Sequence, residues 1–321
     1  MRKITFFLVA LCVALGLFLS ACSNQIGLWK YIKQTDRFYS ITISDRYGLF
    51  LGDSTNSHKI YHYPDKTIQN MEQYITIDYK DKFRRTCFLK DDFWFVTDSS
   101  QMVKYSLLTK TVTEYPQINK LGNVLNCVAS NNQDSLVVWG EHWVAIHKLE
   151  WTSYVLSNIT VQHVIQDDDG KLWVLSSKNE IFYKDGDKWV LWGTFQSKSQ
   201  ANRIWKIGQS IFISTIDDGI YRWIIGNTKP EQLIKFEPDA QGRIYVSIAN
   251  IEKDKDGNIL IMGISKLWMV RQNSVTQIEL PAEYGVSSFA YDKEQNGIYA
   301  TKPLSGGGLY YLDLSTINVT P

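Results

Sequence analysis

A short strand–turn–strand unit recurs along this 321-residue chain, and it limits the possible folds more than any other feature. The two clearest copies are residues 164–174 and 251–261, where an Asp-rich turn with a glycine separates two apolar runs. Each copy has a centre in its second run, and looser copies supply five more centres. The seven centres are Phe50, Trp94, Val137, Trp173, Phe212, Leu260 and Tyr299. They lie about 40 residues apart, a period typical of radially repeated β-sheets.

Each centre is followed by further short runs rich in aromatic and β-branched residues, which favour strands, so that one repeat holds four strands. No stretch from Ser23 onward has the pattern of a long amphipathic helix. One four-stranded sheet cannot bury both of its faces, whereas sheets packed around an axis cover one another. The sequence therefore predicts an all-β fold, a single β-propeller of seven four-stranded blades over residues 35–321. Six or eight blades remain open.

The two Asp-rich turns are predicted to be structural. Glycine supplies the positive φ that such a turn needs, and aspartate accepts hydrogen bonds from the N–H groups of its own turn. An EF-hand calcium loop would need further ligands, so we assign no metal here. The residues expected to shape the turns are Asp167, Asp169 and Gly170, and Asp254, Asp256 and Gly257.

The pattern Asp-x-Asp-Gly-x-Φ-Trp-Val followed by Φ-Tyr/Phe-Tyr, where Φ is apolar, resembles the propeller repeat of two-component regulators. It is also similar to other bacterial extracytoplasmic propeller repeats. Residues 167–174 with 181–183 carry the match. The resemblance implies the fold but no particular activity, because propellers host many unrelated functions. A sensor or accessory role in a regulatory system is one alternative that it leaves open.

The first 21 residues have the features of a cleaved leader. Arg2 and Lys3 precede an apolar run over residues 4–19, which ends at Leu-Ser-Ala-Cys22. This segment resembles a bacterial lipoprotein signal peptide. The resemblance implies cleavage before Cys22 and acylation of that residue, with palmitate among the acyl chains. Residues 22–34 then hold the lipidated cysteine and a short tether or closing strand. A plain secretory leader or a single anchor helix is the alternative.

Several acyl chains on Cys22 would make a stable membrane anchor. The residue after the cysteine is Ser23, whereas an aspartate there commonly retains Gram-negative lipoproteins in the inner membrane. The resemblance therefore implies the bacterial outer membrane, and we expect the periplasmic side rather than the cell surface. The chain holds 34 Lys+Arg and 33 Asp+Glu, a net charge of +1. Proteins that bind nucleic acid usually carry an excess of positive charge, so this composition argues against a nucleic-acid partner.

Chemical motifs are few. No Gly-x-Ser-x-Gly, His-Glu-x-x-His or phosphate-binding glycine loop occurs. His58 and His62 share a strand face without a third metal ligand nearby. Cys87 and Cys127 are expected in or near innermost strands of neighbouring blades. We expect them to be buried, with Cα atoms too far apart to bond, and a disulfide in an oxidising compartment remains the alternative. We therefore expect no catalytic residue, no metal and no cofactor, and keep a propeller enzyme acting on an envelope sugar or lactone-like substrate as the alternative.

Basic residues precede three of the centres by about ten residues. They are Arg84, Arg85, His163 and Arg203, with Tyr284 at a similar position. Innermost strands of a propeller all start on the same face, so these side chains are predicted to converge on one mouth of the central channel. Guanidinium groups there would favour an acidic partner. The alternative is that these arginines are solvated and pair with nearby carboxylates.

The function expected from these features is that of a membrane-anchored envelope lipoprotein. Its propeller would bind or scaffold an envelope protein or peptide without catalysing a reaction, since loops on a rigid scaffold usually carry recognition.

Overall fold

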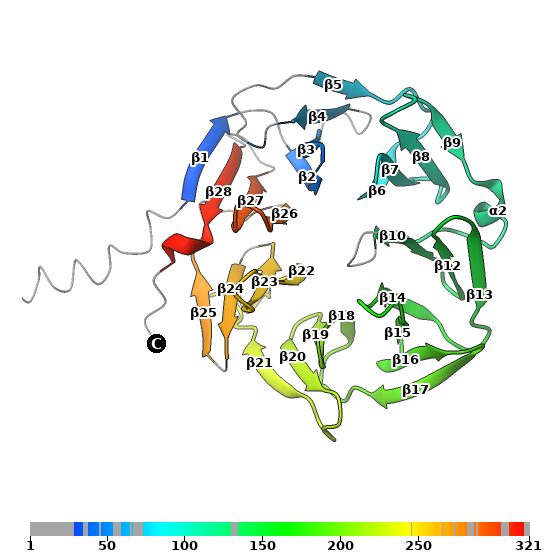
Figure 1. Ribbon diagram of the computed structural model, residues 1–321. Coiled ribbons are helices and arrows are strands. Elements are labelled where there is room, and N and C mark those ends of the chain that lie inside the picture. Colours follow the sequence, from blue (N-terminus) through cyan, green and yellow to red (C-terminus); the bar gives the residue numbers. More distant parts are fainter. Residues whose placement is uncertain are drawn as a thin grey trace, which may run out of the picture.

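Seven four-stranded antiparallel sheets form a ring around a central axis in the computed structural model (Figure 1). The structure describes residues 29–34, 38–44, 46–53, 59–64, 66, 73–129, 134–244, 246–264, 266–272, 274–280, 286, 288–302 and 308–317. The predicted leader, Cys22, His58 and Tyr284 lie outside these residues. The prediction of a seven-bladed, all-β propeller is confirmed.

The blades are numbered in chain order, and each runs outward from the axis. The innermost strands are β2 (Phe38–Ser44), β6 (Phe83–Leu89), β10 (Asn126–Ala129), β14 (Val161–Gln166), β18 (Ala201–Ile207), β22 (Ile248–Lys253) and β26 (Ser288–Asp292). The second strands are β3 (Gly48–Asp53), β7 (Asp92–Thr97), β11 (Leu136–Trp139), β15 (Leu172–Ser176), β19 (Ser210–Thr215), β23 (Ile259–Gly263) and β27 (Gly297–Lys302). Every predicted centre lies on one of these second strands.

The outer half of each blade follows the same order. The third strands are β4 (Lys59–Tyr63), β8 (Met102–Ser106), β12 (Trp143–His147), β16 (Glu180–Asp185), β20 (Gly219–Ile224), β24 (Lys266–Arg271) and β28 (Gly308–Asp313). The outermost strands are β5 (Gln73–Thr76), β9 (Val112–Glu114), β13 (Trp151–Val155), β17 (Lys188–Thr194), β21 (Glu231–Lys235), β25 (Ser274–Ile278) and, in blade 7, β1 (Trp29–Gln34).

Blade 7 is built from both ends of the described chain. Strand β1 pairs antiparallel with β28, with Trp29 opposite Leu312 (Figure 1). The indole Nε1 of Trp29 donates a hydrogen bond of 2.7 Å to the carbonyl oxygen of Glu279, which follows blade 6. The ring is therefore closed by hydrogen bonds between segments that are far apart in sequence.

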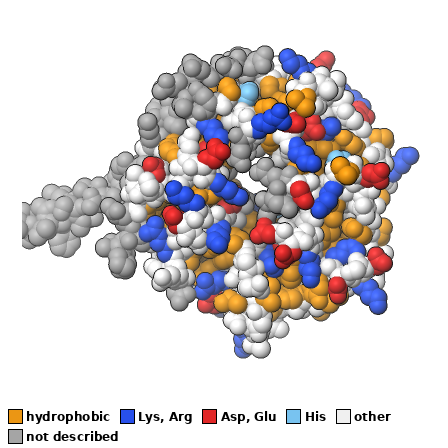
Figure 2. All heavy atoms as spheres, in the orientation of Figure 1, with side chains coloured by type: hydrophobic (Ala, Val, Ile, Leu, Met, Phe, Trp, Pro, Cys, Tyr) orange, Lys and Arg blue, Asp and Glu red, His pale blue; other side chains and the backbone are white. Residues whose placement is uncertain are grey.

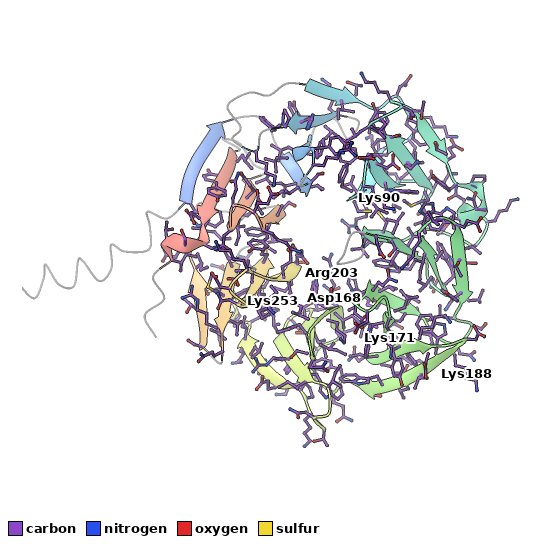
Figure 3. All side chains as sticks on the ribbon, viewed as in Figure 1. Lys90, Asp168, Lys171, Lys188, Arg203 and Lys253 are labelled. Atoms are coloured by element: carbon purple, nitrogen blue, oxygen red, sulfur yellow. The ribbon has the colours of Figure 1, made fainter. Side chains whose placement is uncertain are left out.

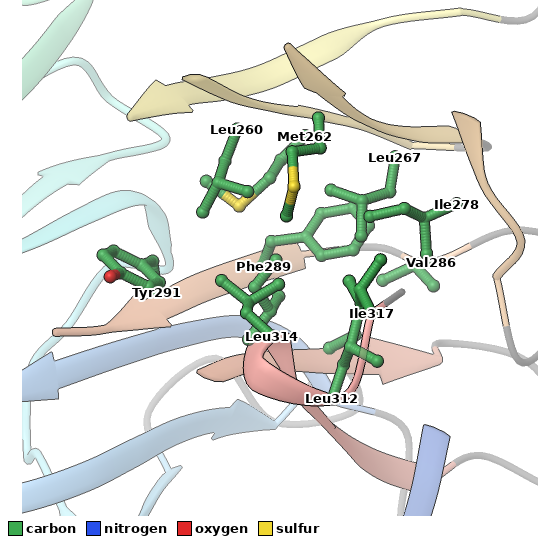
Figure 4. Close-up of a cluster of buried hydrophobic side chains, with 13 residues drawn as sticks. Leu260, Met262, Leu267, Ile278, Val286, Phe289, Tyr291, Leu312, Leu314 and Ile317 are labelled. Atoms are coloured by element: carbon green, nitrogen blue, oxygen red, sulfur yellow. The ribbon is translucent and has the colours of Figure 1, made fainter. Parts of the chain in front are cut away.

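The apolar core lies between blades rather than within them. Seven clusters of buried side chains among the described residues each join two adjacent blades. In β15, Leu172 and Val174 pack toward blade 3, and the alternate residues Trp173 and Leu175 pack toward blade 5. Because both faces of a blade are buried, its second strand reads as a continuous apolar run. Figure 4 shows the cluster between blades 6 and 7.

Helix is nearly absent from the part of the chain that the structure describes. It comprises α2 (Pro116–Asn119) after β9 and the 3-10 turn η1 (Leu314–Thr316) after β28. Within those same residues, no helix is long and apolar enough to cross a membrane.

The two Asp-rich turns join the first and second strands of blades 4 and 6. Asp167 Oδ1 accepts hydrogen bonds from the N–H groups of Asp169 and Lys171, at 3.1 and 2.8 Å. Asp254 Oδ1 does the same in blade 6, at 2.9 and 2.7 Å. Gly170 and Gly257 have φ of +78° and +89°. Since their carboxylates accept these hydrogen bonds, Asp167 and Asp254 act in shaping the turns.

Candidate functional site

Irregular pairing marks the start of the innermost strand in five of the seven blades. The register shifts between Phe38 and Ser40, Phe83 and Arg85, Val161 and His163, Ala201 and Arg203, and Ile248 and Asn250. Such β-bulges bend a strand and redirect its side chains. Because all innermost strands start on the same face, the five bulges lie at one end of the channel. We name the residues after each shift, Ser40, Arg85, His163, Arg203 and Asn250, the bulge ring.

Arg203 links the bulges of blades 5 and 6. Its Nη1 donates to the carbonyl oxygens of Ile248 and Ala249, at 3.2 and 3.1 Å, inside the neighbouring bulge. A bulge interrupts the ladder of backbone hydrogen bonds, so these carbonyls need another donor. Burial, and secondly the charge of Arg85, lowers the pKa of Arg203 below its ordinary value. Figure 3 places Arg203 at the inner edge of the ring.

Arg85 occupies the equivalent position in blade 2, three blades away from Arg203. Its side chain is exposed although β6 is an innermost strand, and it interacts electrostatically with Arg203. No carboxylate among the described residues forms an ion pair with Arg85 or Arg203. Arg243, by contrast, lies 3.0 Å from Asp239 through Nη2 and has the paired arrangement expected of a solvated loop arginine. The charges of these two arginines affect each other, and neither arginine has the carboxylate partner that this alternative expects.

His163 contributes no positive charge to this site. Burial, and secondly the charge of Arg203, lowers its pKa to about 3. Its Nδ1 accepts a hydrogen bond of 3.4 Å from the N–H of Ile204 in the next blade. The ring lies between Trp139 and Trp205, with centroid distances of 5.4 and 5.9 Å. The expectation of four converging basic groups is wrong for His163, because burial keeps the imidazole neutral.

Three further residues extend the polar site through blade 6. Trp205 Nε1 donates to Asn250 Oδ1 at 3.1 Å, and Asn250 Nδ2 donates to Glu252 Oε1. Burial raises the pKa of Glu252 to about 7, although the nearby charge of Lys293 opposes the shift. Sequence reasoning missed these residues. Asn250 precedes its centre Leu260 by ten residues, about the same interval as for the arginines, so its position could have been predicted, but an uncharged side chain is not a signal for anion binding.

Cys87 and Cys127 lie much closer together than expected. Their Sγ atoms are 3.5 Å apart across the boundary between blades 2 and 3, and both residues are free thiols. Burial, with the neighbouring thiol, raises the pKa of Cys87 well above its ordinary value. The two sulfur atoms lie this close because innermost strands of adjacent blades approach each other near the axis.

The remaining candidates are not gathered at this site. Arg84 lies within the bulge of β6, but its side chain is outside the described residues, as is Tyr284. His62 stacks on Phe50 at a centroid distance of 4.5 Å. Among the described residues, no group of three or more His, Cys, Asp or Glu side chains could hold a metal ion. Lys and Arg side chains intermingle with Asp and Glu around the hollow centre of the face in Figure 2.

No protein-family model and no curated protein sequence matches the chain, so its similarities are structural. Virginiamycin B lyase from Staphylococcus aureus is similar with a TM-score of 0.65 and 14% identity, covering 89% of this chain and 98% of that one. YCF48 bound to D1 peptide has a TM-score of 0.63 and 11% identity, covering 88% of this chain and 94% of that one.

The extracellular domain of the putative hybrid two-component system BT4673 from B. thetaiotaomicron is also similar. Its TM-score is 0.61 and its identity 11%, covering 89% of this chain and 39% of that one. This chain thus spans about two fifths of that protein's length. The predicted resemblance to two-component propellers is confirmed at the level of the fold. At such low identities the likeness shows the fold alone.

Proposed function

We propose that this protein is a membrane-anchored binding propeller that receives a segment of an envelope protein or peptide at the bulge ring. The observation that carries this proposal is the pair Arg85 and Arg203, which follow bulges at the same end of two innermost strands and have no carboxylate partner among the described residues. Binding groups are commonly placed at one end of a rigid scaffold in this way. The solved complex of a similar propeller, YCF48, with a peptide supports a peptide as one kind of ligand.

Charge reversal at the ring tests this proposal. Solubilised membranes are passed over the full-length protein, and captured proteins are compared with those retained by Arg85→Glu and by Arg85→Glu combined with Arg203→Glu. Capture is expected to fall in both variants and to weaken as salt rises, since salt screens exposed charges. The control is Lys188→Glu with Lys229→Glu, the same charge change on two exposed residues, one at the start of β17 and one between β20 and β21. Figure 3 places Lys188 at the outer edge of the ring. Equal capture by folded Arg85→Glu and wild type would place recognition elsewhere.

The anchor is part of the same proposal. Acylated Cys22 would hold the propeller at the outer membrane on its periplasmic side, and close to the lipid surface, because only residues 23–28 separate Cys22 from β1. Cys22→Ser should lose metabolic labelling with palmitate and move the protein into the soluble fraction. Unchanged membrane retention of the unlabelled variant would contradict the lipid anchor.

An enzymatic function is the second candidate, and Glu252 is the observation that favours it. A carboxyl group with a pKa of about 7 can accept and donate protons near neutral pH, as a general base must. Activity on an envelope sugar or lactone-like substrate that disappears in Glu252→Gln, while partner capture persists, would favour this candidate. A sensor or accessory role would instead appear as changed output of a regulatory system when the bulge ring is altered.

A further inference from the structure

Arg85 of blade 2 and Arg203 of blade 5 each follow the bulge at the start of an innermost strand, and the charge of Arg85 affects the pKa of Arg203. We propose that this pair binds a carboxylate of an acidic side chain in the segment that the channel receives, an inference that rests on the proposed function. Like charges repel each other in a partly buried site, and an anion placed between them removes that repulsion. A carboxylate also matches the flat, forked arrangement of guanidinium N–H groups.

The guanidinium group of Arg203 is held in place by the neighbouring blade. A guanidinium carries five N–H donors, and the hydrogen bonds of Arg203 to the blade 6 bulge use Nη1 alone. The edge formed by Nε and Nη2 is one of the two that bind carboxylates in a bidentate manner. Because two backbone carbonyls hold the other side of the group in place, little side-chain freedom remains to be lost on binding.

Three other arginines have a carboxylate partner, which Arg85 and Arg203 lack. Arg46, Arg222 and Arg243 each form an ion pair with an aspartate or glutamate. Within the described residues, Arg85 and Arg203 have no such partner. Glu252, two residues beyond the bulge of blade 6, interacts with Lys293 and Asn250 rather than with the arginines. The carboxylate of the proposed ligand would supply such a partner.

The neutral state of His163 fits the same ligand. The Nδ1 atom of His163 accepts a hydrogen bond from the backbone N–H of Ile204. The neutral imidazole therefore does not compete with the arginines for the carboxylate of the ligand. The Arg203 side chain is itself half-buried, which limits the water around its guanidinium group. Lower exposure to water strengthens a charged hydrogen bond.

A labelled hexaglutamate peptide is the probe, and hexaglutamine of the same length is its control. Binding to the detergent-solubilised full-length protein is measured by fluorescence anisotropy. We expect saturable binding of hexaglutamate, none of hexaglutamine, and a loss of about tenfold or more in Arg85→Gln. Arg85→Lys should retain part of the affinity, because it keeps the charge but not the fork. Arg243→Gln, which removes an arginine already paired with Asp239, should bind as wild type.

The outcomes separate this inference from the proposed function. Equal hexaglutamate affinity in wild type and Arg85→Gln, or no binding at all, overturns the carboxylate site. If wild type still captures an envelope protein and Arg85→Glu does not, the binding function stands with a different ligand chemistry. If no protein is captured by wild type while hexaglutamate binds, the carboxylate site stands and the proposed partner class is wrong. Arg203→Lys, which keeps a donor for the bulge carbonyls, repeats the test at the second arginine.

Discussion

The indole Nε1 of Trp173 donates a hydrogen bond of 2.9 Å to Oδ2 of Asp167, six residues earlier in the chain. The other oxygen of the same carboxylate accepts the N–H groups of Asp169 and Lys171. Lys206 of blade 5 approaches Oδ2 to 3.6 Å. One side chain, only 4% exposed, thus connects a turn, the strand that follows it and the next blade.

Replacing Asp167 should destabilise the propeller more than any change at the turn surface. Asp167→Ala leaves the buried N–H of Trp173 without an acceptor and removes two turn hydrogen bonds. We expect the free energy of unfolding to fall by about 2–3 kcal/mol in urea titrations. Asp168→Ala, at the exposed neighbour, is the control and should change it by less than about 0.5 kcal/mol. Similar values for the two variants would show that the buried bond contributes little.

Two glycines with positive φ should respond differently to alanine. At Gly170, with φ +78°, an added Cβ has room, because its nearest neighbour is Gln166 Nε2 at 3.7 Å. Gly170→Ala should therefore lose only the conformational preference, about 1–2 kcal/mol. At Gly48, with φ +85°, a Cβ would also collide with the backbone carbonyls of Tyr63 and Pro64. Gly48→Ala should lower the Tm clearly further, and equal shifts would contradict the role of this close approach.

The free energy of unfolding should depend on the protonation of Glu252. Its pKa is higher in the folded protein, about 7, than the ordinary value of 4.5. The folded state therefore binds the proton more tightly, and stability falls as the pH rises from about 4.5 to about 7. Glu252→Gln should be more stable than wild type at pH 8, by about 1–3 kcal/mol, and similar at pH 4. Glu150→Gln, an exposed change, should show no such pH dependence.

The neighbouring thiols of Cys87 and Cys127 should form a disulfide when a disulfide donor is present. With oxidised glutathione, one cysteine thiolate attacks the glutathione disulfide, forms a mixed disulfide and releases one glutathione thiol. The second cysteine thiolate then attacks this mixed disulfide, forms the Cys87–Cys127 bond and releases the second glutathione thiol. Reaction should be slow at neutral pH, because burial raises the pKa of Cys87. Mass spectrometry of digested protein should find the peptides of the two residues cross-linked. Separate glutathione adducts on both cysteines would mean that their sulfurs cannot approach bonding distance.

The blade architecture was predictable because it depends on local patterns. Short apolar runs, Asp-Gly turns and a regular period specify strands and their order, and Trp173 and Leu260 mark blade positions without reference to any other blade. The bulge ring was predictable only in part. Counting along the chain finds Arg85 and Arg203, because every inner strand starts on the same face. It does not predict the hydrogen bonds and the burial that neighbouring blades impose on those side chains.

The protonation of His163 and the proximity of the two cysteines are both set by neighbouring blades. The pKa of His163 is lowered by burial between Trp139 and Trp205, which come from blades 3 and 5. The cysteines approach each other because inner strands crowd toward the axis. Neither effect has a signature within a single repeat, so both require the assembled ring.

The pairing of β1 with β28 means that the propeller can close only after the last blade has been synthesised. During synthesis, β1 is made before the other described strands but finds its partner only after residues 308–313 have been added. Until then the blades form an open arc, and the cluster between blades 6 and 7, which includes Leu312, Leu314 and Ile317, is unfinished. A chain cut short before Gly308 would expose apolar surface at the gap. Quality-control proteases could therefore distinguish truncated chains from complete ones by this gap alone.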